Sequence, residues 1–217
     1  MKMIEPHGDF RAVLTFSLEM FFMKNTKILA EGAVMVALAT VLSFLKVVQF
    51  PWGGSITVLS MLPIAVFALR YGVKKGLAVS FVYSLIQLGQ GILIDGLLGW
   101  GLTPVSLIAC IFLDYIGAFS LLCFAGVFGN KKMAGIIGGV ILAMVLRFAL
   151  HYFSGVAIFH SFGELWDGFS TDNTWLYSLL YNGAYMLPET VFTTVGALLL
   201  FKTPQMRKLL VTQEEKN

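Results

Sequence analysis

The sequence has few charged residues for its length. Of its 217 residues, 15 are Lys or Arg and 12 are Asp or Glu, which is 12% of the chain. An ordinary soluble domain has about 25%. Hydrophobic residues make up 58%, and the mean hydropathy is +0.83. Part of every compact surface faces water, so a soluble domain of this length cannot bury that much apolar surface. The composition therefore excludes a soluble globular domain, a disordered chain and a nucleic-acid-binding protein.

Cysteine is also scarce, and the familiar catalytic motifs are missing. Cys110 and Cys123 are thirteen positions apart in one predicted helix. At about 1.5 Å per residue they lie roughly 20 Å apart, too far for a disulfide. The chain has no P-loop, no HExxH motif and no GxSxG motif. We therefore expect no ATPase activity in this chain, no bound metal and no cofactor.

Long apolar runs, separated by short polar or Gly/Pro-rich stretches, fill most of the chain. A membrane span needs roughly 20 apolar residues. The second run is shorter and contains Pro63, which predicts a short or broken helix of the kind tolerated beside a cavity. The pattern predicts an all-α membrane protein with six spans and no second domain. The predicted spans are about 27–46, 57–71, 76–98, 104–129, 133–158 and 176–201.

The basic residues fall almost entirely on one side of this arrangement. Lys46 alone lies on the opposite side, and Arg147 lies inside the fifth span. By the positive-inside rule, the basic side is cytoplasmic and both termini are in the cytoplasm. The thirteen basic residues on that side are Lys2, Arg11, Lys24, Lys27, Arg70, Lys74, Lys75, Lys131, Lys132, Lys202, Arg207, Lys208 and Lys216.

The first residues are harder to interpret. Residues 13–22 are apolar, but the run is too short for a secretory signal and no small-residue cleavage site follows it. We predict that residues 1–25 are an extension, either an interfacial helix or a non-native start upstream of Met23. Residues 26–202 then form the six-helix substrate-binding domain, and 203–217 form a cytoplasmic tail.

Polar residues inside the predicted spans are candidates for function, because burying them in lipid is costly. Arg147, His151, Gly155 and Phe159 are four residues apart, so they share one helix face. For Arg147 we favour a structural pairing with a carboxylate, and for His151 contact with a ligand. The other polar residues in the spans are Glu31, Gln87, Gln90, Asp114, Asn182 and Glu189.

Asp114 leaves two readings open. It can pair with Arg147, or it can face a cavity and accept hydrogen bonds from an amine or a cation, which we favour. Tyr177 and Asn182 are five positions apart, about 140° around a helix. They can both face one pocket only if it is wide or the helix starts late.

Two further features lie nearer the amino terminus. In the outer loop at 51–57, two glycines follow Trp52, which suits a lid carrying one large ring or an interfacial anchor. Ala33 and Ala37 form a small-xxx-small pair in the first span, which would allow close approach of another helix.

Four segments, taken in order, carry a resemblance to a known family. They are Pro51–Thr57 running into Met61–Ile64, Leu113–Tyr115, Arg147 and His151 followed by Ser154–Val156, and Tyr177–Gly183. In a six-helix chain of this length they resemble the thiamine-specific S components of energy-coupling factor (ECF) transporters. The resemblance covers roughly residues 26–202.

The resemblance implies a bacterial plasma-membrane protein that binds thiamine with high affinity in an outward-facing pocket. It also implies delivery with a separate transmembrane coupling subunit and two ATPases. The implied coupling-subunit contacts are Ala33 and Ala37. The implied ligand contacts are Asp114, Tyr115, His151, Phe159, Tyr177 and Asn182, with Trp52 carried over less directly.

The chain departs from the family pattern at two positions. Asp114 stands where the family has glutamate, and Phe159 where it often has a second stacking tryptophan. A cation lies better over tryptophan than over phenylalanine. We expect these changes to alter affinity rather than the class of ligand.

The residues by themselves suit the same ligand. Thiamine is a flat permanent cation with an aminopyrimidine, and a site for it needs rings, a carboxylate, and amides or hydroxyls. Three alternatives stay open: an S component for another vitamin or for a thiamine precursor, a solitary carrier, or an intramembrane enzyme using His151, Asp114 and Glu189. The enzyme is disfavoured because no nucleophile or metal motif accompanies these residues. Apart from the ligand and the coupling module, membrane lipid is the expected partner.

Overall fold

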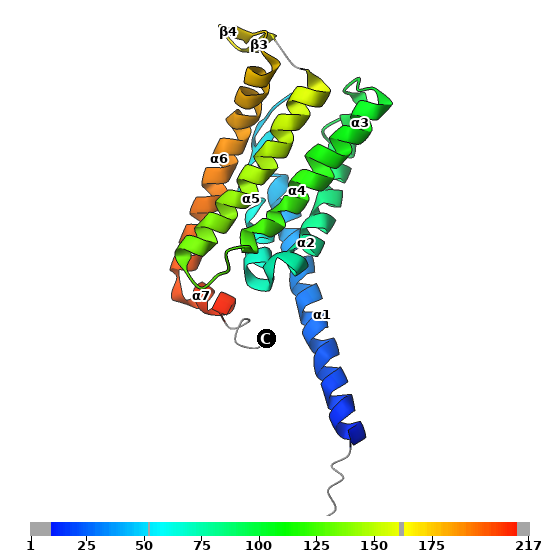
Figure 1. Ribbon diagram of the computed structural model, residues 1–217, viewed down its shortest axis with the longest axis vertical. Helices are drawn as coiled ribbons and strands as arrows, with labels where there is room; N and C mark the ends of the chain where they lie inside the picture. The colour runs from blue at the N-terminus through cyan, green and yellow to red at the C-terminus, as the bar shows by residue number, and fades with distance from the viewer. Residues whose placement is uncertain (1–9, 52, 161–162, 212–217) are drawn as a thin grey trace, which may run out of the picture.

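The computed structural model describes residues 10–51, 53–160 and 163–211, and it is a bundle of long helices (Figure 1). Among these residues five helical stretches are long and apolar enough to cross a membrane. One of them, α2, holds two of the predicted spans, so the prediction of six is confirmed. The main helices are α1 (Phe10–Ser43), α2 (Leu62–Leu93), α3 (Pro104–Cys110), α4 (Ala118–Ser120), α5 (Met133–Ser154), α6 (Thr174–Lys202) and α7 (Pro204–Val211).

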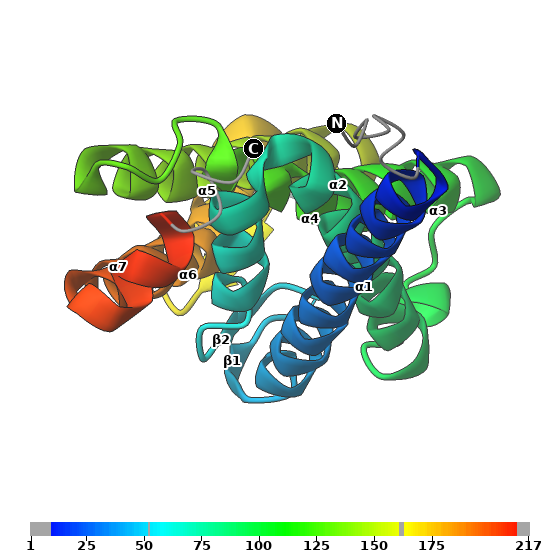
Figure 2. The ribbon, with the colours of Figure 1, turned by 90° about the horizontal axis from the view of Figure 1, so that it is seen from below.

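The helix α2 reverses direction at Gly72, which has φ 79° and ψ 173°. A Cβ placed on Gly76 would lie 2.8 Å from the Cβ of Ala68. In a straight helix, residues eight positions apart are separated by about 12 Å. The chain therefore folds back, and the two halves of α2 meet at a turn near the centre of Figure 2. This glycine turn separates the second predicted span from the third.

The fourth and fifth spans each contain a wide turn. In the fourth, α3 continues into the π-helical segment η2 (Ile111–Gly117), then α4 and the 3-10 segment η3 (Leu121–Gly126). In the fifth, α5 continues into a second π-helical segment, η4 (Gly155–Phe159). Such turns are rare in proteins as a whole, and those that do occur are often found at functional sites.

Two short hairpins lie outside the helices, and neither was predicted. One consists of β1 (Lys46–Gln49) and β2 (Ser55–Thr57) and joins α1 to α2. The other consists of β3 (Gly163–Trp166) and β4 (Phe169–Thr171), and it precedes α6 at the end of the bundle opposite α7 (Figure 1). By the charge distribution, this end is the outer one.

The cytoplasmic half of the bundle is a tightly packed apolar core. Helices approach closely there because Gly126 and Gly139 carry no Cβ, which would collide with the carbonyl oxygens of Ala68 and Ala125 respectively. The short helix α7 covers this end with Leu210, which is buried. The buried apolar residues of this core are Ala65, Val66, Ala68, Leu69, Ala125, Ile136, Val140, Ala143, Ala197, Phe201 and Leu210.

Candidate ligand-binding site

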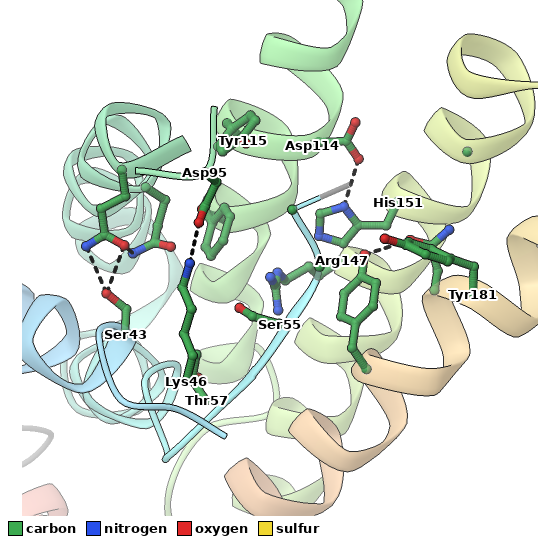
Figure 3. Close-up of a pocket in the computed structure, with 18 of the residues that line it drawn as sticks. Ser43, Lys46, Ser55, Thr57, Asp95, Asp114, Tyr115, Arg147, His151 and Tyr181 are labelled. Carbon is green, nitrogen blue, oxygen red and sulfur yellow. Dashed lines mark hydrogen bonds and ion pairs between the residues drawn. The ribbon is translucent and has the colours of Figure 1, made fainter. Parts of the chain in front are cut away.

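A cavity lies between the β1–β2 hairpin and the helices around it, and Figure 3 shows side chains from several of them converging on it. The structure brings most of the predicted ligand contacts together around this cavity. Trp52 lies outside the described residues, although the adjacent Gly53 and Gly54 line the cavity. The predicted contacts that line it are Asp114, Tyr115, His151, Phe159, Tyr177 and Asn182.

Asp114 is held by two side chains of the fifth span. Its Oδ1 lies 2.8 Å from Nδ1 of His151, and its Oδ2 accepts a hydrogen bond from the hydroxyl of Ser154. A carboxylate has about four acceptor positions, so Asp114 can accept further bonds from a ligand. The π-helical segment η2 carries this residue.

His151 presents its second ring nitrogen without a partner. The imidazole is buried, and no protein atom among the described residues bonds its Nε2. When the ionised Asp114 accepts from Nδ1–H, the tautomer leaves Nε2 as an acceptor. The rings of His151 and Tyr185 meet edge to face, with centroids 5.9 Å apart.

Arg147 corrects one of our expectations. Within the described part of the chain its guanidinium forms no ion pair with a carboxylate, so the structural pairing that we favoured is absent, and so is a pairing with Asp114. The guanidinium lies over the ring of Phe119 at 4.3 Å, and one Nη donates to the sulfur of Met186. The side chain is buried, lines the cavity and points toward its interior (Figure 3).

The α6 wall of the cavity is a connected set of polar groups. The amide nitrogen of Asn182 donates to the backbone oxygen of Ser178 at 3.0 Å, and the amide oxygen accepts from the hydroxyl of Tyr185 at 2.6 Å. The ring of Tyr177 stacks on that of Tyr181, with an interplanar angle of 14°. Tyr177 and Asn182 both line the cavity, so the cavity is wide enough to span the angle between them.

Two glycines allow the helices that form the cavity wall to pack closely against each other. A Cβ on Gly91 would overlap the hydroxyl and ring of Tyr115, and a Cβ on Gly155 would overlap the hydroxyl of Ser178. The ring of Tyr115 therefore lies against the α2 backbone, and α6 lies close beside the start of η4.

The other end of the cavity contains a second polar group that our sequence analysis did not assign to the site. The hydroxyl of Ser43 and the amide of Gln90 bond each other, at 2.9 and 3.1 Å. Nearby, Nζ of Lys46 lies 2.5 Å from the carboxylate of Asp95, which also accepts from Gln49 at 2.9 Å. Figure 3 shows this group opposite Asp114 and His151. The available signal was that Lys46 is the single basic residue on the outer side.

The β1–β2 hairpin is also anchored on α6. Glu189 is buried, and one of its oxygens accepts from both the backbone N–H and the hydroxyl of Thr57, the latter at 2.7 Å. The carboxylate of Asp95 thus binds β1, and the carboxylate of Glu189 binds β2.

Ala33 and Ala37 lie away from the cavity. Both are exposed on α1, within its membrane-spanning part. They remain candidates for contact with another protein rather than with the ligand.

Comparison with known proteins identifies the family. A sequence model of the thiamine transporter protein family (Thia_YuaJ) matches residues 29–208. The chain belongs to the thiamine transporter family. It is 31% identical over 195 residues to the thiamine transporter ThiT of Bacillus subtilis (strain 168), covering 83% of this chain and 93% of that one.

Two further relatives agree with this family assignment. ThiT of Lacticaseibacillus paracasei is 27% identical over 203 residues, covering 84% of this chain and 91% of that one. A solved structure of ThiT from Listeria monocytogenes superposes with a TM-score of 0.64 at 26% identity, covering 85% of this chain and 98% of that one. The membership confirms a multi-pass protein of the bacterial plasma membrane that is a transporter and not an enzyme.

Proposed function

We propose that this family member is the high-affinity thiamine-binding S component of an ECF-type uptake transporter. It takes thiamine from the outer side and delivers it across the membrane with a separate coupling subunit and two ATPases. The observation that carries the proposal is the cavity in which Asp114, held by His151 and Ser154, faces a set of aromatic rings.

The charges around the cavity favour a ligand with one positive charge. Lys46 and Asp95 neutralise each other in their ion pair. Glu189 binds Thr57, which lines the cavity, and its carboxylate offsets the formal charge of Arg147 although the two form no ion pair. With His151 neutral, the described residues then leave a formal charge of −1 at the cavity, that of Asp114, which matches the single positive charge of a thiazolium ring.

The neutral groups suit the rest of thiamine. Nε2 of His151 can accept from the exocyclic amine, and the hydroxyls of Tyr177 and Tyr115 can bond ring nitrogens or the hydroxyethyl group. Asn182 is already bonded to Ser178 and Tyr185, and these two hydrogen bonds fix the orientation of its amide group in the cavity wall.

Isothermal titration calorimetry of the detergent-purified chain with thiamine tests the binding proposal. We expect one site per chain with a sub-micromolar Kd. Titration with the neutral pyrimidine half alone is the comparison, and we expect much weaker binding because the charge of Asp114 is then unused. Equal affinity for both would transfer the proposal to a precursor transporter, and binding of neither would overturn it.

A second experiment tests the coupling proposal. In cells that express the coupling subunit and ATPases, Ala33→Trp and Ala37→Trp should abolish thiamine uptake, because a large ring prevents close helix approach. Binding by the purified variants should stay at the wild-type level. The control is Val34→Trp, a neighbouring exposed position outside the small-residue pair. Wild-type uptake by both alanine variants, or uptake without any ATPase subunit, would contradict the coupling.

A further inference from the structure

Trp100 is fixed in position at the outer end of α2. It follows the 3-10 turn η1 (Leu97–Gly99), whose Leu97 is 1% exposed and anchors the turn in the core. The indole N–H donates to the backbone oxygen of Asp95 at 3.1 Å. That same Asp95 holds β1 through its side chain. The ring therefore has one orientation, set by the residue that also anchors the hairpin.

The ring of Trp100 lies between two parts of the cavity wall. Its centroid is 6.1 Å from that of Phe159, with the planes tilted by 57°. On the hairpin side, a Cβ placed on Gly53 would lie 2.6 Å from the indole ring, so only glycine lets the hairpin backbone pack this close. Trp100 also lines the cavity itself. One indole thus joins the fifth span, the hairpin and the cavity.

We propose that Trp100 is a ligand-contacting residue that forms, together with Phe159, the aromatic wall against the cationic ring of the ligand. The inference rests on the proposed function, because it needs a ligand with a positively charged ring. Indole binds a cation more strongly than a phenyl ring does. Trp100 supplies that indole beside Phe159.

The contact with Gly53 also seats the hairpin backbone on the indole, so a test substitution has to keep an aromatic ring in this position. Trp100→Phe keeps an aromatic ring in the turn, loses the bond to Asp95 and leaves a smaller surface for the cation.

The test compares two ligands of the same shape and different charge. They are thiamine and 3-deazathiamine, in which a neutral thiophene replaces the thiazolium. By calorimetry we expect Trp100→Phe to raise the Kd for thiamine about five-fold or more, and the Kd for 3-deazathiamine less than two-fold. Adding Phe159→Trp to Trp100→Phe should restore thiamine binding. Trp175→Phe is the control, because Trp175 lies on the surface with 54% of its area exposed.

The outcomes separate this inference from the proposed function. Unchanged thiamine affinity in Trp100→Phe overturns the inference while leaving the function intact. Equal weakening for both ligands, with a lower melting temperature in the absence of ligand and no rescue by Phe159→Trp, assigns Trp100 a structural role and also overturns it. Failure of the wild-type chain to bind thiamine overturns the proposed function.

Discussion

The same helices meet differently in the two halves of the bundle. In the cytoplasmic half, Gly126 and Gly139 bring helix backbones into contact, and the buried residues there are almost all apolar. In the outer half, the same spans stand around a cavity, with Asp114 and His151 facing into it. The inner half supplies packing that holds the spans together, and this lets the outer half keep a cavity lined by polar groups, among them the unpartnered Nε2 of His151.

The largest expected effect is on binding in the outer half. Asp114→Asn should raise the Kd for thiamine at least ten-fold, because charge-assisted hydrogen bonds contribute about 1.5–3 kcal/mol. Isothermal titration calorimetry measures this change in Kd. Asp167→Asn is the matched control: it removes the same charge from the exposed turn of the β3–β4 hairpin, where Asn-Gly suits the turn equally well. Equal losses in both variants would mean that long-range attraction, not contact, explains the role of Asp114.

The next effect is on stability in the inner half. Gly139→Ala should cost about 1–3 kcal/mol, because the new methyl group collides with the carbonyl of Ala125. Its neighbour Gly138 has ordinary space, with Phe128 at 3.5 Å, so Gly138→Ala should not destabilise the protein. Thermal unfolding in detergent distinguishes the pair. Thiamine affinity of the folded Gly139→Ala protein should be unchanged, and a large loss would show that the halves are not independent.

The smallest expected effect comes from replacing one tyrosine by phenylalanine in each half, which removes a single hydrogen bond. Tyr185→Phe removes the bond to Asn182, and Tyr71→Phe removes the 2.5 Å bond to Glu31 near the cytoplasmic end. Each should cost about 1 kcal/mol of stability. Only Tyr185→Phe should weaken thiamine binding, by about five-fold, because it alone frees a residue of the cavity wall. Melting temperatures and calorimetry on the same samples test this, and equal affinities would remove Asn182 from the site.

Much of the fold could be predicted because hydropathy and charge are local properties of the chain. All six spans were found, and the second is short, as its short apolar run predicted. Pro63 lies in the first turn of α2 and does not break the helix, since proline is tolerated there. The β1–β2 hairpin was missed because its anchors are remote in sequence: Asp95 binds Lys46, and Glu189 binds Thr57. No local pattern records pairings over such separations.

The candidate site was predictable where it follows helix geometry. The four-residue spacing placed Arg147, His151 and Phe159 on one face, and all three line the cavity. Helix spacing gives the direction of a side chain but not its partner, so the carboxylate expected for Arg147 was wrong. Trp100 was missed because an outer-side tryptophan is typical of a membrane interface.

The two wide turns have a consequence for how such a site can change over generations. Each π-helical turn, η2 and η4, accommodates an extra residue compared with a regular turn. Loss of a single codon there would restore a regular turn and leave the later side chains of that span facing nearly the same way, because the wide turn absorbs the extra residue locally. Only the side chains of the turn itself, Asp114 in η2 among them, would then change direction, while the rest of the span kept its packing. Insertions and deletions of one residue, and not only substitutions, are therefore a route to new ligands in this architecture.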